Sequence, residues 1–243
     1  MCTLTWSAVR EGGYDLFFNR DELNTRGAEQ PPRVETRDGV AFASPRDGDR
    51  GGTWLLANAH GVTVALLNDY AVRWRPAGDA VSRGAVVLAC AAAATSEAVT
   101  AMIGKLPLEN AGPFTVIALG ADGRARRLHW SGVQLEEATA EGLSFETSSS
   151  FATEAVCAER RRRFEELGAG GIWLEREKLE TFHWAHDAAN GAASVLMRRP
   201  DARTRSVTRV SVRGDRVEMH YQPVGQDNAA AVSGGEVIGF ARS

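Results

Sequence analysis

The sequence predicts an α+β domain in which helices cover two stacked antiparallel sheets. Several segments alternate apolar and polar residues with the period of a strand, and short stretches of turn residues separate them. Helical patterns gather in two groups between these strands. Each sheet must bury one face, and helices can cover the others. The chain has no internal repeat and no long linker, so residues 1–243 are expected to form a single domain.

Hairpins account for most of the predicted strands. Residues 2–8 alternate in polarity, the turn Glu11-Gly12-Gly13 follows, and an aromatic-rich segment completes a hairpin over 2–19. Antiparallel pairing about this turn sets Cys2 beside residues 21–23, to within about one residue. A polar, proline-containing loop is expected from there to residue 52. Further strands are expected at 53–57, 62–67, 114–119, 124–130, 143–147, 194–197, 206–212 and 216–221.

Four helices are expected. Residues 82–105 are rich in alanine, and Ser82 and Ser96 stand where N-caps would begin two consecutive helices. Two more are expected over 152–167 and 172–186. The third contains four consecutive arginines, 160–163, with glutamates at helical spacing on either side, which predicts a solvated, ion-paired face rather than a nucleic-acid site.

Composition narrows the class of protein. A formal net charge of -3, with 44% hydrophobic and 24% charged residues, is typical of a soluble globular protein and argues against nucleic acid as a partner. Three cysteines without CxxC spacing predict neither a disulfide framework nor a thiolate zinc site. The start of the chain lacks a signal-peptide pattern, and no apolar run is long enough to span a membrane. A cytoplasmic location is expected, and the oligomeric state stays open.

Cys2 follows Met1 directly, and a residue this small permits removal of the methionine. The exposed cysteine would then carry both a thiol and an α-amino group, so one residue would supply a nucleophile and its base. The alternative is that Cys2 is a small apolar residue of the first strand.

Four polar residues end the second strand at the register of Cys2. The carboxylate of Asp21 is placed to orient the ammonium group, and the guanidinium of Arg20 to favour the thiolate or to bind a substrate carboxylate. An Arg-Asp pair in a solvated loop is the simpler alternative.

Several motifs together resemble the NRDE family, which includes the eukaryotic transport and Golgi organisation 2 proteins. The resemblance covers about residues 1–221 and rests on agreement in order and spacing. The motifs are Met-Cys-Thr-Leu-Thr-Trp at 1–6, Asn-Arg-Asp-Glu at 19–22 with Arg26, Gly-Gly-Thr-Trp at 51–54, Leu-Asn at 67–68, Ser-Arg-Gly at 82–84 and Arg-Ser at 205–206.

The family is similar to N-terminal cysteine amide hydrolases, and this resemblance implies a four-layer αββα sandwich with N-terminal-nucleophile chemistry. It implies that Cys2 is the nucleophile, Asp21 the partner of its amine, Arg20 a neighbour that tunes charge, Asn68 an oxyanion donor and Arg205 a buried charge at the site, with Arg203 as the alternative arginine. The hydrolases use a second oxyanion asparagine, where this chain has serines at 148–150. The substrate-binding set is therefore predicted as Asn19, Glu22, Trp54, Ser148 and Arg203.

We consider two alternative functions for this chain. The first is hydrolysis of a small linear amide or a thioester, which requires no cofactor. The second is a carrier that binds haem or an acyl ligand in the same cleft, as the resemblance to a family associated with haem trafficking implies. His183 and His186 share one helix face, but a metal site needs further ligands, so none is predicted.

Overall fold

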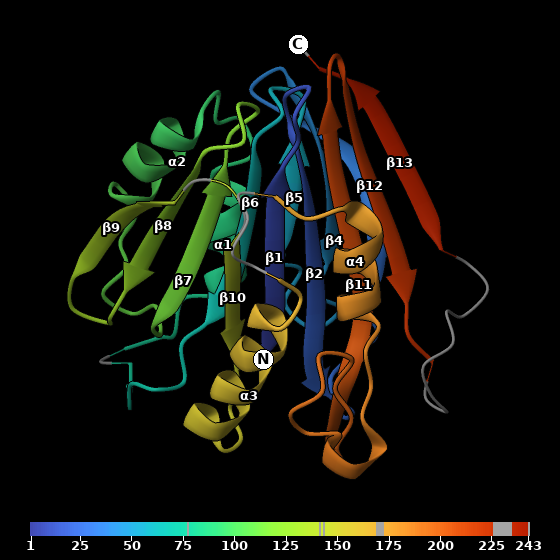
Figure 1. The fold of residues 1–243 in the computed structure, drawn as a ribbon. Helices are drawn as coiled ribbons and strands as arrows, with labels where there is room; N and C mark the ends of the chain where they lie inside the picture. The colour runs from blue at the N-terminus through green and yellow to red at the C-terminus, as the bar shows by residue number, and fades with distance from the viewer. Residues whose placement is uncertain (77, 141, 143, 169–172, 226–234, 243) are drawn as a thin grey trace.

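Two antiparallel sheets stacked face to face form the centre of the computed structural model (Figure 1), which describes residues 1–76, 78–140, 142, 144–168, 173–225 and 235–242. Within these residues, the first sheet has the order β10 (Ser144–Ser148), β1 (Cys2–Ala8), β2 (Tyr14–Leu23), β11 (Ala202–Arg213), β12 (Arg216–Pro223) and β13 (Glu236–Ala241). The second has the order β3 (Gln30–Arg37), β4 (Val40–Arg46), β5 (Leu55–Asn58), β6 (Thr63–Asn68), β7 (Phe114–Leu119), β8 (Ala125–Trp130) and β9 (Leu135–Ala140).

Helices pack against both sheets. In the second sheet, α1 (Arg83–Ala89) contacts β5 and β6, and α2 (Ser96–Ile103) contacts β7 and β8. In the first sheet, α3 (Thr153–Glu165) contacts β10, and α4 (Arg176–His183) contacts β2. A short 3-10 helix, η1, covers Ala188–Asn190. None of the described helices is both long and apolar enough to cross a membrane.

The buried apolar residues form separate clusters on the two faces of each sheet, because successive side chains of a strand point to opposite faces. One apolar cluster lies between the sheets and includes Leu4, Leu55 and Met219. A second joins the second sheet to α1 and α2, and a third joins the first sheet to α3 and α4 through Phe145 and Phe164. Every strand of the first hairpin therefore presents one row of side chains to the other sheet and one row to the helices.

The first hairpin forms as predicted, with a small difference in register. Cys2 lies opposite Arg20, one residue before the predicted range of 21–23. The hairpins over β5 and β6 and over β7 and β8, the four helices and the strands β10, β11 and β12 also form near their predicted positions. The predicted boundaries at residues 143 and 172 lie outside the described residues. The helix cap expected at Ser96 is one residue earlier, at Thr95, whose side chain accepts from the Ala98 amide.

Three predictions about strands are wrong. The expected loop before residue 52 contains the hairpin of β3 and β4, turned by Asp38 and Gly39 with φ of 51° and 80°. Pro31 and Pro32 are tolerated because β3 is an edge strand, where the outward N–H groups need no ladder partner. β9 and β13, also at sheet edges, were not expected: β9 lacks a clear apolar row, whereas β13 has Ile238 and Phe240 on the side that packs against the core. Residues 194–197 are buried without forming a strand.

The turn of the first hairpin provides a prediction of stability. Gly12 and Gly13 both have positive φ, of 90° and 91°, but a Cβ at Gly13 would lie 2.0 Å from the carbonyl oxygen of Val212, whereas one at Gly12 would meet nothing within 4 Å. We expect Gly12→Ala to lower the free energy of unfolding by about 1–2 kcal/mol, the strain of a left-handed residue. Gly13→Ala should lower it at least twice as much in urea titration, and equal losses would contradict the close approach of β11.

Candidate functional site

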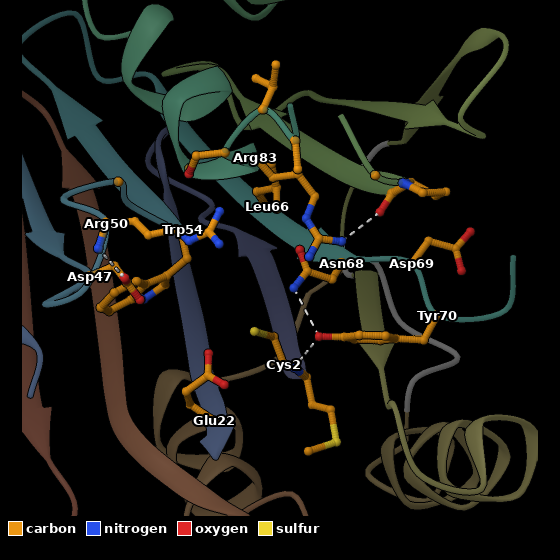
Figure 2. Close-up of a pocket in the computed structure, with 18 of the residues that line it drawn as sticks. Cys2, Glu22, Asp47, Arg50, Trp54, Leu66, Asn68, Asp69, Tyr70 and Arg83 are labelled. Carbon is orange, nitrogen blue, oxygen red and sulfur yellow. Dashed lines mark hydrogen bonds between the residues drawn. The ribbon is translucent and has the colours of Figure 1, made fainter. Parts of the chain in front are cut away.

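A pocket of about 820 Å³ opens where β1 begins and β2 and β6 end. Figure 2 shows side chains from β1, β6, the following segment and α1 converging on it. Of the ten residues predicted for the site, six line this pocket: Cys2, Arg20, Asp21, Glu22, Trp54 and Asn68. The structure therefore brings together residues that are up to 66 positions apart in the sequence.

Cys2 is the first residue of β1 and is 8% exposed. It pairs with Arg20 on one side and with Ser148 of β10 on the other, and directly opposed side chains lie on the same face of a sheet. The Ser148 hydroxyl is buried and has no hydrogen-bond partner among the described residues. Burial raises the pKa of the Cys2 thiol, while the amino terminus and Arg20 act to lower it.

The amino group of Met1 lies inside the molecule. It donates to the main-chain oxygen of Asp21 at 3.3 Å and to the Tyr70 hydroxyl at 3.4 Å, and the Asp21 amide donates back to the Met1 carbonyl at 3.0 Å. Burial acts to lower the pKa of this ammonium, but Cys2, Tyr70 and Asp21 outweigh burial and raise it. The Met1 side chain is enclosed by Met197 and Ala202.

The pairing of Met1 with Asp21 fixes the direction in which the main-chain groups of Cys2 point. Hydrogen-bonded and non-hydrogen-bonded pairs alternate along an antiparallel ladder. Because Met1 exchanges both of its main-chain bonds with Asp21, the main-chain nitrogen of Cys2 points away from β2 and toward β10. Ser148 thus lies on the side of Cys2 toward which that nitrogen is directed.

Arg20 is held by acidic partners. Its guanidinium donates to Glu29 at 2.6 Å, to Asp47 at 2.8 Å and to Glu22 at 3.3 Å, and it lies 4.3 Å from the centre of the Trp54 ring. Burial acts to lower the pKa of Arg20, but the carboxylates outweigh burial and raise it. The side chain is therefore a fixed part of the pocket wall whose positive charge is already balanced.

Asp21 faces the helices, where it forms a fully buried ion pair. Its carboxylate accepts from Arg160 of α3 at 3.1 Å and from the Thr204 hydroxyl at 2.6 Å, and both side chains of the ion pair have 0% exposure. Arg160 also donates to the Thr3 hydroxyl at 2.9 Å. The amino terminus contacts the main-chain oxygen of Asp21, whereas the carboxylate is engaged by α3 and β11.

The burial of Arg160 corrects the prediction of a solvated arginine face. Val156, Arg160 and Phe164 are buried at a spacing of four residues, which defines the inward face of α3. That spacing was the available signal in the sequence. The remainder of the prediction holds for Arg162 and Arg163, both of which pair with Glu159.

Asn19 and His183 form a second buried polar group beneath α4. Asn19 donates from its amide nitrogen to the main-chain oxygens of His183 and Val195, which leaves its oxygen to accept from Nδ1 of His183 at 2.7 Å. Nε2 of His183 therefore accepts from the Thr5 hydroxyl at 2.8 Å. Burial and the nearby Arg160 charge lower the pKa of His183 to about 3, so the ring is neutral near pH 7. Asn19 is directed toward α4 and does not line the pocket.

The two candidate arginines of β11 also do not line the pocket. Arg205 donates to the main-chain oxygens of Leu23 and Arg26 at 3.3 and 3.4 Å, and Arg203 donates to the Asn24 side chain at 2.8 Å. Thr204 between them is the residue that reaches Asp21. The fully buried arginine that pairs with Asp21 is Arg160, whereas Arg205 is half-buried.

Tyr70 was missed by sequence reasoning. Its hydroxyl accepts from the amide nitrogen of Asn68 at 3.0 Å and lies beside the amino terminus. Tyr70 comes two residues after Asn68, the end of the strand, and no sequence pattern indicated that the two side chains would be in contact. Within the described residues, no group of three potential metal ligands is present.

Comparisons with known proteins give a family and a fold. A family model described as Transport and Golgi organisation 2 matches residues 1–155. A comparison with curated proteins finds no match. Among solved structures, the fold is similar to a Caenorhabditis elegans ortholog of N-acylethanolamine-hydrolyzing acid amidase, with a TM-score of 0.57 and 14% identity over 86% of this chain and 92% of that one.

Two other solved structures are similar. One is a C2A mutant of the conjugated bile acid hydrolase from Clostridium perfringens, with a TM-score of 0.56 and 11% identity over 99% of this chain and 96% of that one. The other is penicillin V acylase from Agrobacterium tumefaciens, with a TM-score of 0.54 and 13% identity over 91% and 83%. Because these sequence identities are low, the comparison with the solved structures establishes similarity of fold alone.

A double-mutant cycle tests the buried ion pair. Asp21→Asn and Arg160→Met should each lower the free energy of unfolding by about 3–5 kcal/mol, because each leaves one charged or polar partner buried without its match. The double variant should lose clearly less than the sum of the two, as measured by denaturant unfolding. Additive losses would show that the two side chains do not interact.

The neutral His183 predicts a dependence of stability on pH. Its pKa is about 3 in the folded chain and about 6.5 when unfolded, so the unfolded chain binds this proton more strongly between those values. Lowering the pH from about 7.5 to 5.5 should therefore reduce the free energy of unfolding by about 1.4 kcal/mol through this group. His183→Gln should flatten the profile by that amount, and an unchanged slope would rule out a buried neutral ring.

Proposed function

The chain belongs to the transport and Golgi organisation 2 family, and on that premise we propose that it is an N-terminal cysteine hydrolase. It cleaves a small linear amide or thioester, with Cys2 as the nucleophile once Met1 has been removed. The observation that carries this proposal is the position of Cys2: it begins β1, lines the pocket and lies between Arg20 and Ser148 in a fold similar to that of amide hydrolases.

The four-layer αββα sandwich belongs to this proposal. It is supported by the stacked sheets, by the packing of α1 and α2 on one and of α3 and α4 on the other, and by separate apolar clusters under each pair. In such a sandwich the first strand is buried on both faces, so its amino end is held rigidly. A rigid amino end suits a nucleophile that is also the end of the chain.

Removal of Met1 provides the base. While Met1 is present, the Cys2 nitrogen is an amide and cannot accept a proton. After removal it is an amine directed toward β10, where Ser148 lies opposite Cys2. The free amine takes the thiol proton, and the thiolate attacks the substrate carbonyl. Arg20, which acts to lower the pKa of the thiol, favours this step.

The tetrahedral intermediate needs hydrogen-bond donors for its oxyanion. We assign the first to the amide nitrogen of Asn68, which lines the pocket and now donates to Tyr70. The second is the hydroxyl of Ser148, which is opposite Cys2, buried and without a partner in the described residues. This serine takes the place of the second asparagine of the amide hydrolases.

Collapse of the intermediate completes the reaction. The bond between carbonyl carbon and leaving nitrogen breaks, the ammonium of Cys2 gives its proton to the departing amine, and an acyl thioester remains on Cys2. Water then attacks the thioester, the amine takes a proton from the water, and the thiol returns as the acid leaves. Asp21 acts as a positioning residue, because Arg160 and Thr204 fix its carboxylate and so fix the end of β2 that lies beside Cys2.

A carrier of haem or an acyl ligand is the second candidate. The enclosed Met1 favours it, because a chain that keeps this residue has no free amine at Cys2. Cys2 and Tyr70, whose residue types ligate haem iron in other proteins, line the pocket. A haem titration of the protein with Met1 retained, with Tyr70→Phe as its control, separates this function from hydrolysis.

Hydrolysis is tested with short N-acyl amides and acyl thioesters. We expect turnover by the processed protein, an acyl adduct on Cys2 in intact-mass spectra during turnover, and loss of at least about 10⁴-fold in kcat/KM in Cys2→Ala. Cys90→Ala, which changes a buried thiol outside the pocket, is the matched control and should remain active. Turnover that survives in Cys2→Ala would refute the assigned nucleophile.

The serine donor is tested by substitution of neighbouring hydroxyls. Ser148→Ala should lower kcat by about 10²- to 10³-fold with little change in KM, as expected for one oxyanion donor. Ser150→Ala, two residues away and exposed, should have no effect. If Ser148→Ala keeps full kcat, a main-chain amide or another group must hold the oxyanion.

A further inference from the structure

The pocket contains more positive charge than its own carboxylates balance. Six arginines line it, and two of them, Arg20 and Arg26, are paired with acidic residues. The other four form no ion pair with any carboxylate in the described part of the chain. They are Arg50, Arg73, Arg75 and Arg83.

The acidic residues of the pocket are already engaged. Asp21 pairs with Arg160, Glu22 with Arg20, and Asp69 with His129 at 2.9 Å, while Asp47 accepts from Arg20 and Arg26. In the described residues, none of these carboxylates forms an ion pair with any of the four remaining arginines. A negative charge brought by a ligand would pair with them.

Arg83 is the deepest of these four. It begins α1, is half-buried, and extends toward Asn68 on the cavity wall (Figure 2). Among the described residues, its side chain makes one hydrogen bond, donated to the main-chain oxygen of Pro113 at 3.3 Å. Burial lowers the pKa of Arg83, the direction expected when a charge is desolvated without a matching partner. A guanidinium has five N–H donors in a planar fork, so most of its hydrogen-bonding capacity is free.

The remaining three arginines are exposed at the mouth of the pocket. Arg50 follows β4, and Arg73 and Arg75 belong to the segment that leads from β6 to α1. Exposed charges of one sign around a cleft raise the local concentration of an oppositely charged ligand and speed its association, although salt screens this effect. They attract the ligand, whereas Arg83 is placed to bind it.

We propose that the substrate is an anion, and that Arg83 determines specificity by binding its carboxylate or phosphate group inside the pocket. This inference rests on the proposed hydrolase function and names the substrate class for the same site. Carboxylate and phosphate each present two oxygens that a guanidinium binds with two parallel hydrogen bonds. Because Asn68 lies beside Arg83, the anionic group lies close to the reacting carbonyl.

The test uses four amides of one chain length. N-octanoylethanolamine is neutral. On the amine side of the amide bond, N-octanoylglycine carries a carboxylate and N-octanoylphosphoethanolamine carries a phosphate. Suberic acid monoethanolamide carries a carboxylate on the acyl side. Dissociation constants are measured calorimetrically on Cys2→Ala, and kcat/KM on the processed wild-type protein. The four compounds separate carboxylate from phosphate and one side of the scissile bond from the other.

We expect at least one anionic amide to bind about 10-fold or more tightly than the neutral one, the usual range for a charge-assisted hydrogen-bonded pair. Adding Arg83→Gln to Cys2→Ala should abolish that preference, and a circular dichroism spectrum equal to that of Cys2→Ala shows that the variant is folded. Arg83→Lys should keep part of the preference. Arg33→Gln, the same change at an exposed position of β3 outside the pocket, should keep all of it.

Equal affinity for neutral and anionic amides, or a preference that survives Arg83→Gln, would overturn the inference. The two proposals fail separately. Anion-selective binding without turnover of any compound would leave the anion site standing and refute the hydrolase. Turnover of the neutral amide at the same rate as the anionic ones would leave the hydrolase standing and refute the anion site.

Discussion

The buried ion pair between Asp21 and Arg160 connects the parts of the fold on which the site depends. Asp21 belongs to β2, and Thr204, which donates to it, belongs to β11. Arg160 belongs to α3 and also donates to Thr3 of β1. With both charged side chains fully buried, neither charge is tolerable without the other, so the docking of α3 and the register of the three strands are established together.

That register decides which residues take part in chemistry. Side chains alternate along β1 and β2, so Cys2 and Arg20 face the pocket while Thr3, Asn19 and Asp21 face the helices. Adjacent polar residues that look equivalent in the sequence therefore have different tasks. Arg20 forms the pocket wall, whereas Asn19 anchors α4 through His183. The four residues at 19–22 are conspicuous as a group because both faces of the strand end are polar.

The parts of the structure that depend on short-range pairing were predictable from the sequence. A tight turn at residues 11–13 fixes the register of Cys2 and Arg20 to within one residue, because a hairpin leaves few alternatives. Cys2, Asn68 and Trp54 were placed at the site through family motifs, and the pocket contains all three. Helices with an evident cap or alanine-rich pattern were also found.

Long-range partners were less accessible. A run of arginines flanked by glutamates predicts surface pairing, and only the fold reveals that Arg160 has a buried aspartate 139 residues away. Arg203 and Arg205 were both reasonable candidates for a charge near the site, yet the residue between them reaches Asp21. The hairpin of β3 and β4 was missed because prolines usually argue against a strand. Prolines are tolerated in an edge strand, but which strand lies at an edge is a property of the whole sheet.

The central claim is that Cys2 becomes the reactive amino terminus of the chain. The most direct test is the intact mass of natively expressed protein before and after treatment with a thiol-reactive acylating probe, compared with Cys2→Ala. The account predicts a protein that lacks Met1 and gains one label that Cys2→Ala does not gain. Retention of Met1, or equal labelling of the two proteins, would contradict it.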